Sequence, residues 1–492
     1  MIDDPAALGP VPPALVAAYA ADRFRDEGHR LIELLADHLG RATGRDDAPV
    51  IRWQPPAAAR AAWPADFPEQ PAEDLLAVLG RTVDGSIRLH HPRYLGHQVP
   101  PPLPAAALVD ALAALLNNGM AVYEMGGAAT PMEAAVIDWM ARTLGLPAGA
   151  GGVLTSGGSA GNLTALLAAR QARAGFDVWT EGAHAGPPLA VLVAATAHYS
   201  IGRAVRALGW GDGGAIAVAV DDRHRMRPDD LPRALAAAAA AGRKVIAIVA
   251  SAGSTATGAF DPLPAIADVA AAHGLWLHVD GAHGASAALS ARHRHLVDGI
   301  DRADSVVWDA HKLMAMPALC TAVLYRDDVC GYHAFAQDAS YLFLGDAADG
   351  ERERPWWDVG LRTLECTKRM LGTIVYASLR AYGVGAFRDY VDRTFALGAA
   401  LAARIAAAPD FELATPPDAN IVCFRYRPDP ALAGAELDAL QARIRQRCLE
   451  RGHTYFLQTR LAGATWLRSA LMNPLTEGRD LDDLLATIRA AA

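Results

Sequence analysis

A lysine that follows an apolar segment is the first candidate for covalent chemistry in this chain. Lys312 ends the string Asp309-Ala-His-Lys, directly after the apolar segment Ser305–Trp308, and the string LMAMPALC follows it. Burial disfavours the ammonium form of a lysine and favours the neutral amine, which can form a Schiff base with a carbonyl compound. Taken alone, the residue also fits a solvated surface loop, because most lysines are exposed.

An acid ends a second apolar segment. Leu275–Asp280 reads LWLHVD, and Gly-Ala-His283-Gly follows. A carboxylate in this place could hold a proton on the ring nitrogen of a heteroaromatic cofactor, although an Asp that caps the next helix is an equal alternative. His278 and His283 flank Asp280, but residue 283 lies beyond the turn, so their spacing does not fit a metal site. We expect no metal.

A glycine-rich turn could bind phosphate. The string Leu154-Thr-Ser-Gly-Gly158-Ser159-Ala-Gly-Asn162 precedes a helical pattern. Glycine permits close backbone approach, and the start of a helix offers free N–H groups to an anion. Such turns are common, so this signal is weak alone. No GK[ST] follows, and no dinucleotide fingerprint stands in the right context, which argues against a P-loop enzyme or a dinucleotide-dependent oxidoreductase.

Two further polar strings also follow apolar segments. His198 stands in AHYS, where an imidazole could stack on a cofactor ring or move a proton, although a single histidine is more often structural. Thr255 stands in SAGSTATGAFD, whose hydroxyl groups could reach the same region, or which could be a polar turn.

The elements around these strings predict one sheet that positions them all. Strands are expected at Ala190–Ala195, Val245–Ala250, Leu275–Asp280 and Ser305–Trp308, with helices at 160–171, 201–207, 229–241 and 262–273. This alternation indicates a mostly parallel sheet with helices on both faces. Ligands of such sheets bind at the carboxyl ends of the strands, so we expect the candidate residues to meet at one edge.

Both ends of the chain differ from this central part. Residues 14–43 have the periodicity of one or two amphipathic helices. A Pro-rich segment follows and is expected to be extended, with Pro55, Pro56, Pro64, Pro68 and Pro71. After residue 376 we expect a helix at 387–407, a strand at Asn420–Tyr426, a helix at 434–450 and a strand near Thr465–Leu471.

These patterns predict three regions. They are an N-terminal helical arm with its connector (1–90), a large domain (91–375) and a small α+β domain (376–492). The arm has little core of its own, so we expect it to pack on a second subunit.

Composition excludes several classes of protein. The 492 residues are 52% hydrophobic and 20% charged, which is typical of a globular chain. The formal net charge of -9 argues against a protein that coats nucleic acid or anionic lipid. The sequence lacks a signal-peptide pattern and any apolar stretch long enough to span a membrane. Its five cysteines are scattered, which favours a reducing cytoplasm.

Taken in order, these strings resemble the group II pyridoxal-phosphate-dependent amino-acid decarboxylases, which include enzymes for aromatic amino acids, glutamate, cysteine sulfinate and 2,4-diaminobutyrate. The resemblance runs from about residue 85 to 380, and HVDGAHG (278–284) with DAHK (309–312) is its most specific part. The strings look closer to the diaminobutyrate and glutamate-like branch than to the aromatic branch.

The resemblance implies an α/β protein of the fold-type-I pyridoxal-phosphate-dependent transferase class. Its mostly parallel central sheet is flanked by helices, with a small C-terminal α+β domain and an N-terminal helical arm. It also implies a homodimer with the active site at the subunit interface and an L-amino acid as substrate.

The resemblance further implies roles for single residues. Lys312 would form the Schiff base with pyridoxal 5'-phosphate, and Asp280 would pair with its ring nitrogen. The other expected cofactor contacts are Gly158 and Ser159 at the phosphate, His311 near it, His198 stacked on the ring, Ala282 under the ring and Thr255 close by.

Substrate residues are implied in three places. Gln98, in HPRYLGHQ, matches a stretch that shapes the substrate pocket, and Tyr341, in DASYL, matches a tyrosine that returns a proton to the substrate Cα. Lys368 stands where an Arg that binds the substrate carboxylate is usual, so Lys368 and Arg369 are both candidates.

The expected reaction is α-decarboxylation of an L-amino acid to the amine and carbon dioxide. An aldehyde-forming oxidative deaminase, a β-lyase and an aminotransferase share the Lys and Asp and remain alternatives. A pseudo-enzyme would have lost Lys312, Asp280 or Tyr341, and all three are present. The substrate side chain stays open at this point.

Overall fold

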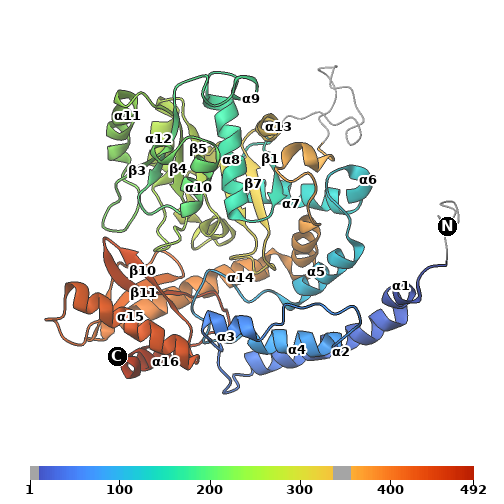
Figure 1. The fold of residues 1–492 in the computed structure, drawn as a ribbon. Coiled ribbons are helices and arrows are strands. Elements are labelled where there is room, and N and C mark those ends of the chain that lie inside the picture. Colours follow the sequence, from blue (N-terminus) through green and yellow to red (C-terminus); the bar gives the residue numbers. More distant parts are fainter. Residues whose placement is uncertain (1–9, 336–355) are drawn as a thin grey trace.

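The computed structural model describes residues 10–335 and 356–492 (Figure 1). The N-terminal helices are α1 (Pro13–Ala18), α2 (Ala21–Thr43), α3 (Pro56–Ala61) and α4 (Leu75–Gly85). The central part contains α5 (Pro104–Leu116), α6 (Tyr123–Gly126), α7 (Ala129–Leu144), β1 (Gly151–Thr155), α8 (Gly158–Arg173), α9 (Val178–Glu181), β2 (Leu189–Ala194), α10 (Tyr199–Ala207), β3 (Ala215–Val218), α11 (Leu231–Ala240), β4 (Lys244–Ser251), α12 (Leu263–Ala272), β5 (Trp276–Asp280), β6 (Ser305–Asp309), β7 (Thr321–Tyr325) and α13 (Val329–Ala334). The C-terminal part contains α14 (Leu371–Ala407), β8 (Phe411–Leu413), β9 (Ile421–Tyr426), α15 (Gly434–Arg451), β10 (Leu457–Leu461), β11 (Ala464–Ala470) and α16 (Gly478–Ala491).

The central sheet is mostly parallel, as predicted. Its strand order is β1-β7-β6-β5-β4-β2-β3, and β7 runs antiparallel to both of its neighbours. The remaining strands therefore share one direction, and their carboxyl ends lie at one edge. The predicted strands correspond to β2, β4, β5 and β6, with ends that differ by a residue. The sequence patterns do not predict β1, β3 or β7.

Helices cover both faces of this sheet because alternate strand residues point to opposite sides. Val191 and Val193 of β2 belong to the apolar cluster that also holds residues of α8 and α10. Leu192 and Ala194 belong to a second cluster, which holds residues of α7, α11 and α12. Burial on both faces explains why these strands are nearly continuous apolar runs rather than alternating ones.

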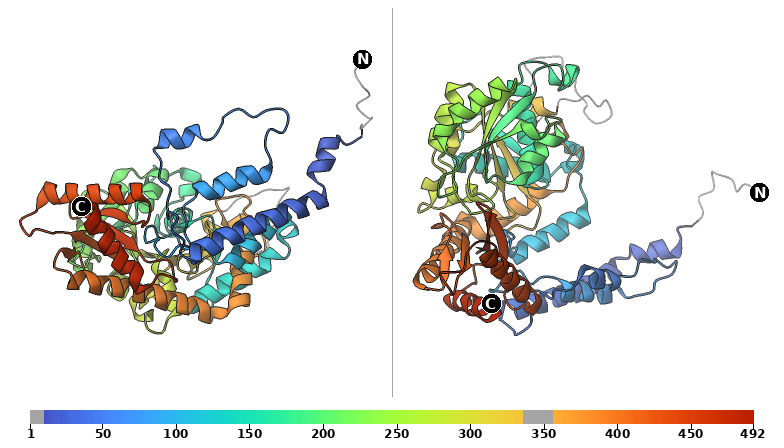
Figure 2. Two further views of the ribbon diagram at one scale, coloured as in Figure 1. Left: turned by 90° about the horizontal axis from the view of Figure 1, so that it is seen from below. Right: turned by 60° about the vertical axis from the view of Figure 1, so that its left-hand side comes forward.

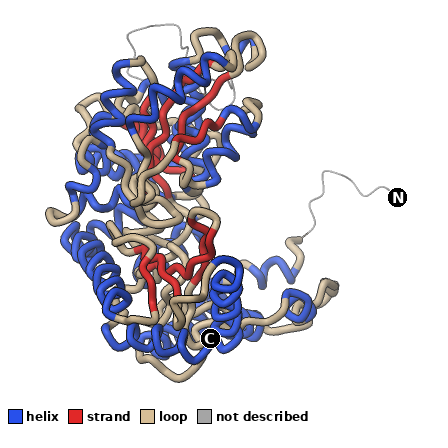
Figure 3. Tube along the Cα trace, turned by 90° about the vertical axis from the view of Figure 1, so that its left-hand side faces the viewer, coloured by secondary structure: helices blue, strands red, loops and turns tan. Residues whose placement is uncertain are grey.

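A smaller antiparallel sheet lies beside the large one (Figure 3). Its order is β10-β11-β9-β8, and α15, α16 and the end of α14 pack with it in a separate apolar cluster. The helix α14 has a break at Gly383, whose φ of 72° is a conformation that glycine adopts readily. This helix also crosses residue 375, the boundary predicted between the large and small domains, so the position of that boundary stays a prediction.

The N-terminal arm reaches away from the rest of the chain (Figure 2). Helices α1, α3 and α4 contain no buried residue, and α2 contains one, Ala42. The prediction of an extended Pro-rich connector is wrong at α3, because Pro56 begins a helix there. Proline suits the first position of a helix, where its missing N–H would have no partner within the helix. Within the described ranges no helix has both the length and the apolar character needed to cross a bilayer.

Candidate active site

A cavity of about 300 Å³ opens at the carboxyl ends of the central strands. The segments that follow β1, β2, β4, β5 and β6 all contribute to its walls. Its lining includes every residue that the sequence analysis assigned to a cofactor, namely Gly158, Ser159, His198, Thr255, Asp280, Ala282, His311 and Lys312. The strings that follow separate strands therefore meet in one place.

The glycine-rich turn after β1 brings backbone N–H groups to the cavity. Gly157 has a φ of 115°, which residues with a side chain rarely adopt, and α8 begins at the next residue. A Cβ atom at Gly158 would lie 3.0 Å from Oδ2 of Asp309, so the absence of a side chain lets the turn and the end of β6 approach each other. The first N–H groups of α8 have no partner within the helix, and they suit an anion such as phosphate.

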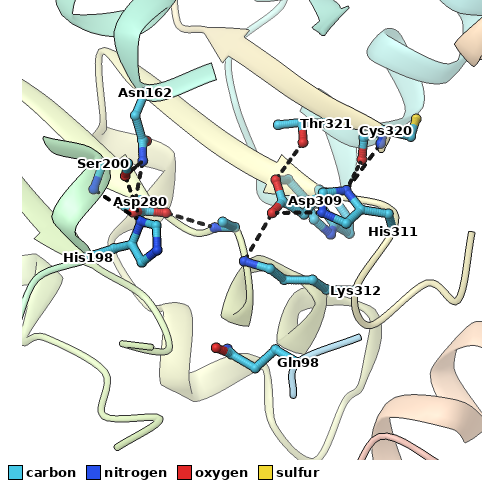
Figure 4. Close-up of polar contacts among 12 residues, drawn as sticks. Gln98, Asn162, His198, Ser200, Asp280, Asp309, His311, Lys312, Cys320 and Thr321 are labelled. Atoms are coloured by element: carbon cyan, nitrogen blue, oxygen red, sulfur yellow. Dashed lines mark hydrogen bonds and ion pairs between the residues drawn. The ribbon is translucent and has the colours of Figure 1, made fainter. Parts of the chain in front are cut away.

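Asp280 is held by neutral donors (Figure 4). Its Oδ2 accepts a hydrogen bond from Nδ2 of Asn162 at 3.0 Å, and its Oδ1 accepts one from the backbone N–H of Ala282 at 3.2 Å. Among the described residues Asp280 has no ion-pair partner. Beside it, burial lowers the pKa of His198 below its usual value; Asp280 opposes this shift and Lys312 adds to it.

Lys312 lies against a second buried carboxylate. Its Nζ is 3.0 Å from Oδ2 of Asp309, a residue that is 1% exposed. Thr321 donates a hydrogen bond to Oδ1 of Asp309 at 2.7 Å, and Nε2 of His311 lies 3.5 Å from Oδ2. The predicted burial of Lys312 is therefore accompanied by a counter-charge, which the sequence analysis did not anticipate.

A buried arginine that was not predicted lies near the cavity. Arg468 of β11 is 5% exposed, and its Nη2 donates to Thr255 O at 2.7 Å and to Oε1 of Gln98 at 3.2 Å. It has no carboxylate partner among the described residues, and Nε2 of Gln98 is buried without a hydrogen-bond partner. An Arg inside the apolar string Trp466-Leu-Arg-Ser-Ala-Leu was the available signal in the sequence.

The structure does not bring Lys368 or Arg369 to the cavity. Lys368 is buried and forms an ion pair with Glu133 of α7, and it also donates to Leu154 O. Arg369 is exposed and pairs with Asp110 of α5 at 2.7 Å. Both cations already have carboxylate partners, so neither is placed to meet a substrate. Tyr341 lies outside the described residues.

These residues fit the parts of pyridoxal 5'-phosphate. The turn at Gly157 and Gly158 suits the phosphate, the Asp280 carboxylate suits a protonated ring nitrogen, and the Lys312 amine suits the aldehyde carbon. A family model described as the pyridoxal-dependent decarboxylase conserved domain matches residues 56–427.

The chain belongs to the pyridoxal-dependent decarboxylase family.

Two kinds of relative agree with this membership. The cysteine sulfinic acid decarboxylase of Mus musculus is 34% identical over 85% of this chain and 85% of its own length. The crystal structure of mouse CSAD aligns with a TM-score of 0.87 and 29% identity, over 95% of this chain and 99% of that one. The structure described as the glutamate decarboxylase domain of diaminobutyrate-pyruvate transaminase and L-2,4-diaminobutyrate decarboxylase from Vibrio parahaemolyticus aligns with a TM-score of 0.80 and 27% identity, over 94% of this chain and 95% of that one.

This decarboxylase therefore has the predicted fold, cofactor and reaction class. It is a carboxy-lyase that uses pyridoxal phosphate to remove the α-carboxyl group of an amino acid. The aldehyde-forming, β-lyase and aminotransferase alternatives are not favoured. The geometry adds Asn162, Asp309 and Arg468 to the residues that the sequence analysis had selected, and each of them contacts a residue that lines the cavity.

Proposed function

We propose that this decarboxylase acts on a short L-amino acid with an acidic side chain and that Arg468 binds an anionic group of that substrate. The observation that supports this is the buried guanidinium of Arg468, which is held by neutral oxygens and touches Gln98 beside the cavity. A buried cation without a carboxylate partner is costly unless a ligand supplies the charge. The named relative that acts on cysteine sulfinic acid supports the same substrate class.

Gln98 supplies a second feature that suits an acidic substrate. The free Nε2–H donor of Gln98 suits a carboxylate or sulfinate oxygen.

A panel of amino acids tests the substrate proposal. L-Cysteine sulfinate, L-aspartate, L-glutamate, L-2,4-diaminobutyrate and L-tyrosine are incubated with the loaded enzyme, and carbon dioxide, amine and ammonia are measured together. We expect an acidic substrate to exceed the diamino and aromatic ones by about 100-fold in kcat/KM. A preference for tyrosine or diaminobutyrate would contradict the proposal.

Two arginine variants test the anion site. Arg468→Lys keeps the charge but loses the planar fork, and we expect about a 100-fold lower kcat/KM for the acidic substrate. Arg425→Lys is the matched control, because Arg425 is a partly buried arginine of the same small sheet that pairs with Glu412 instead. Equal losses in the two variants would indicate a structural role for Arg468.

We also propose how the cavity residues act in the reaction. The turn at Gly158 and Ser159, with His311, would hold the phosphate, and Lys312 would hold the cofactor covalently. Asp280 would keep a proton on the ring nitrogen, with His198 beside the ring. When bound, pyridoxal phosphate supplies the electron sink for the pair left as carbon dioxide departs. Asp309 would stabilise the ammonium of Lys312 whenever that amine is free.

Tyr341 is proposed as the acid that returns a proton to Cα. A Cα that receives no proton stays open to oxygen, so we expect Tyr341→Phe to yield less amine and more aldehyde, ammonia and peroxide per carbon dioxide. Tyr199→Phe removes a phenol that lines the cavity and is the matched control. An unchanged product ratio in Tyr341→Phe would assign the proton to another group.

The arm supports a proposed twofold homodimer with the active site at its interface. Large apolar side chains of α1, α2 and α4 are exposed, among them Leu15, Val16, Phe24, Ile32 and Leu75, and so are Leu108, Leu112 and Leu115 of α5. We expect sedimentation to give a dimer, and we expect deletion of residues 1–88 to give monomers with little activity. A fully active monomer would contradict this assembly.

Because all five cysteines are free, we propose the reducing cytoplasm as the location of this enzyme.

A further inference from the structure

We propose that Asn162 is a positioning residue that joins Asp280 and His198 in one hydrogen-bonded chain, and that this chain fixes the proton of His198 on Nε2. The proposal rests on the proposed roles of Asp280 and His198 toward the cofactor. It goes beyond them because it assigns a positioning role to buried residues of the sheet interior and predicts a single tautomer for His198.

The chain begins in the core with a group that can only donate. The indole N–H of Trp276 donates to Oγ of Ser305 at 2.8 Å. Oγ of Ser305 lies 2.9 Å from Nδ1 of His278, and Nε2 of His278 lies 2.9 Å from Oδ1 of Asn162. Each of these four residues is at most 2% exposed, so water does not compete for their hydrogen bonds.

The next acceptor fixes the tautomer of His278. The amide oxygen of Asn162 can only accept, so Nε2 of His278 must carry a hydrogen. Burial lowers the pKa of His278 to about 4, so the ring is neutral near pH 7 and Nδ1 is bare. The hydroxyl of Ser305 must then donate to that nitrogen. Every bond from Trp276 to Asn162 therefore points in the same direction.

The amide nitrogen of Asn162 divides this chain into two branches (Figure 4). One hydrogen goes to Oδ2 of Asp280 at 3.0 Å, and the other goes to Oγ of Ser200 at 2.9 Å. A carboxylate can only accept, which fixes the orientation of the amide independently of His278. One side-chain amide thus contacts both the carboxylate and the residue that bonds His198.

The second branch ends at His198. Because Ser200 accepts from Asn162, its own hydrogen is free to donate to Nδ1 of His198, which lies 2.8 Å away. The backbone N–H of Ser200 also donates to this nitrogen at 3.3 Å, so the His198 side chain caps the start of α10. Two donors aimed at Nδ1 leave no place for a hydrogen there. The neutral ring of His198 therefore carries its hydrogen on Nε2 and offers the cavity a donor rather than an acceptor.

Neutron diffraction tests the tautomer directly. Crystals of the cofactor-free protein, exchanged into deuterium oxide, should show deuterium on Nε2 of both His198 and His278 and none on Nδ1 of His198. Deuterium on Nδ1 of His198 would overturn the proposal. This measurement needs neither activity nor a variant, so it stands even if the substrate or the reaction proves different from the one proposed.

Variants of Asn162 test the link to the cofactor site. We expect Asn162→Ala to weaken binding of pyridoxal phosphate about 10-fold, measured by quenching of protein fluorescence, since a hydrogen bond to the charged Asp280 is lost. Asn162→Asp should weaken binding about 100-fold, because a second carboxylate would lie beside Asp280 and favour its protonation. Thermal melting of each cofactor-free variant shows whether it is folded.

Asn420→Ala provides the matched control. Asn420 is also a buried asparagine that bonds a cavity histidine, with Oδ1 at 2.8 Å from Nε2 of His283, but it touches neither Asp280 nor His198. We expect its effect on cofactor affinity to stay within about 3-fold. Wild-type affinity in folded Asn162→Ala, or an equal loss in Asn420→Ala, would overturn the positioning role of Asn162. If Asn162→Ala does not fold, the neutron measurement decides.

Discussion

Two aspartates end neighbouring strands of the same cavity, yet their charges are balanced in different ways. Asp309 is the last residue of β6 and is buried beside the Lys312 cation, with a hydroxyl donor from Thr321. Asp280 is the last residue of β5 and receives hydrogen bonds from an amide and a backbone N–H. The charge of Asp309 is thus compensated within the protein. The charge of Asp280 meets dipoles alone, and it remains available to a cation that arrives from outside.

Because of this difference, we expect Asp309 to matter more for the stability of the fold and Asp280 to matter more for the reaction. Removing one member of a buried ion pair leaves the other charge without compensation, which destabilises the fold. Removing a carboxylate that is held by neutral donors disturbs the fold less, but it removes the group that would stabilise a protonated ring. We therefore expect the two aspartates to rank in opposite orders when stability and turnover are compared.

The largest effect is expected for Lys312→Ala. This change removes the amine that would hold the cofactor, so we expect turnover to fall by several orders of magnitude. After treatment with borohydride and proteolysis, mass spectrometry should find no cofactor attached to the chain, whereas the wild type should carry it at residue 312. A cofactor adduct elsewhere on the variant would show that another lysine holds it.

We expect the second largest loss of turnover for Asp280→Asn, with kcat lower by about 10²–10³-fold. The amide has nearly the same shape, so we expect the melting temperature of the cofactor-free protein to change little. Steady-state kinetics and a thermal melt of the same preparation measure both quantities. Near-normal turnover would mean that the ring nitrogen does not need this carboxylate.

Asp309→Asn should show the reverse pattern. We expect about a 10-fold loss of kcat, less than for Asp280→Asn, because the group does not face the ring nitrogen in the proposed arrangement. The melting temperature of its cofactor-free form should fall further, since Lys312 is left partly buried without its counter-charge. Identical profiles for the two variants would remove the distinction between the aspartates.

The smallest effect concerns stability at acid pH. Burial lowers the pKa of His278 to about 4 and that of His283 to about 3, below the usual 6.5. Between these values and pH 6.5 the unfolded chain binds protons that the folded chain does not, so stability falls as pH falls through this window. Between pH 6.5 and pH 5 each group contributes at most about 2 kcal/mol, at about 1.4 kcal/mol per pH unit.

Urea unfolding at pH 7 and pH 5 measures this loss. His278→Gln should be less stable than the wild type at pH 7 but should lose less stability between the two pH values. His453→Gln, which changes an exposed histidine, should keep the wild-type slope. An unchanged slope in His278→Gln would show that this histidine is not protonated on unfolding.

Sequence patterns sufficed for the elements whose signals are local. The strands β2, β4, β5 and β6 are apolar runs between helical patterns, and each is followed by a polar string that lines the cavity. β1 begins with Gly151-Gly152, β3 is four residues long, and β7 follows an apolar loop, so none has a clear local signal. The antiparallel place of β7 between β1 and β6 depends on pairing between distant segments, which no short window contains.

The site residues also differ in whether a local sequence pattern predicts them or only long-range contacts do. Residues that stand directly after a strand were found, whereas Asn162, Asp309 and Arg468 matter through contacts with residues far along the chain. Lys368 was weighed as a substrate ligand because its motif position suggested it. Its partner Glu133 lies 235 residues earlier in the sequence, and only the folded structure shows that this carboxylate forms an ion pair with Lys368.

The position of β1 also sets an order in which the enzyme can be made. The phosphate turn follows β1, and among the described residues β1 pairs only with β7, the strand of the large sheet that is synthesised last. A nascent chain that ends before Thr321 has the glycine turn, Asp280 and Lys312, but it lacks the strand that seats the turn at the sheet edge. The vitamin-derived cofactor is therefore expected to bind only after synthesis has passed Tyr325 of the 492 residues, and a translation product truncated before Thr321 should not capture it.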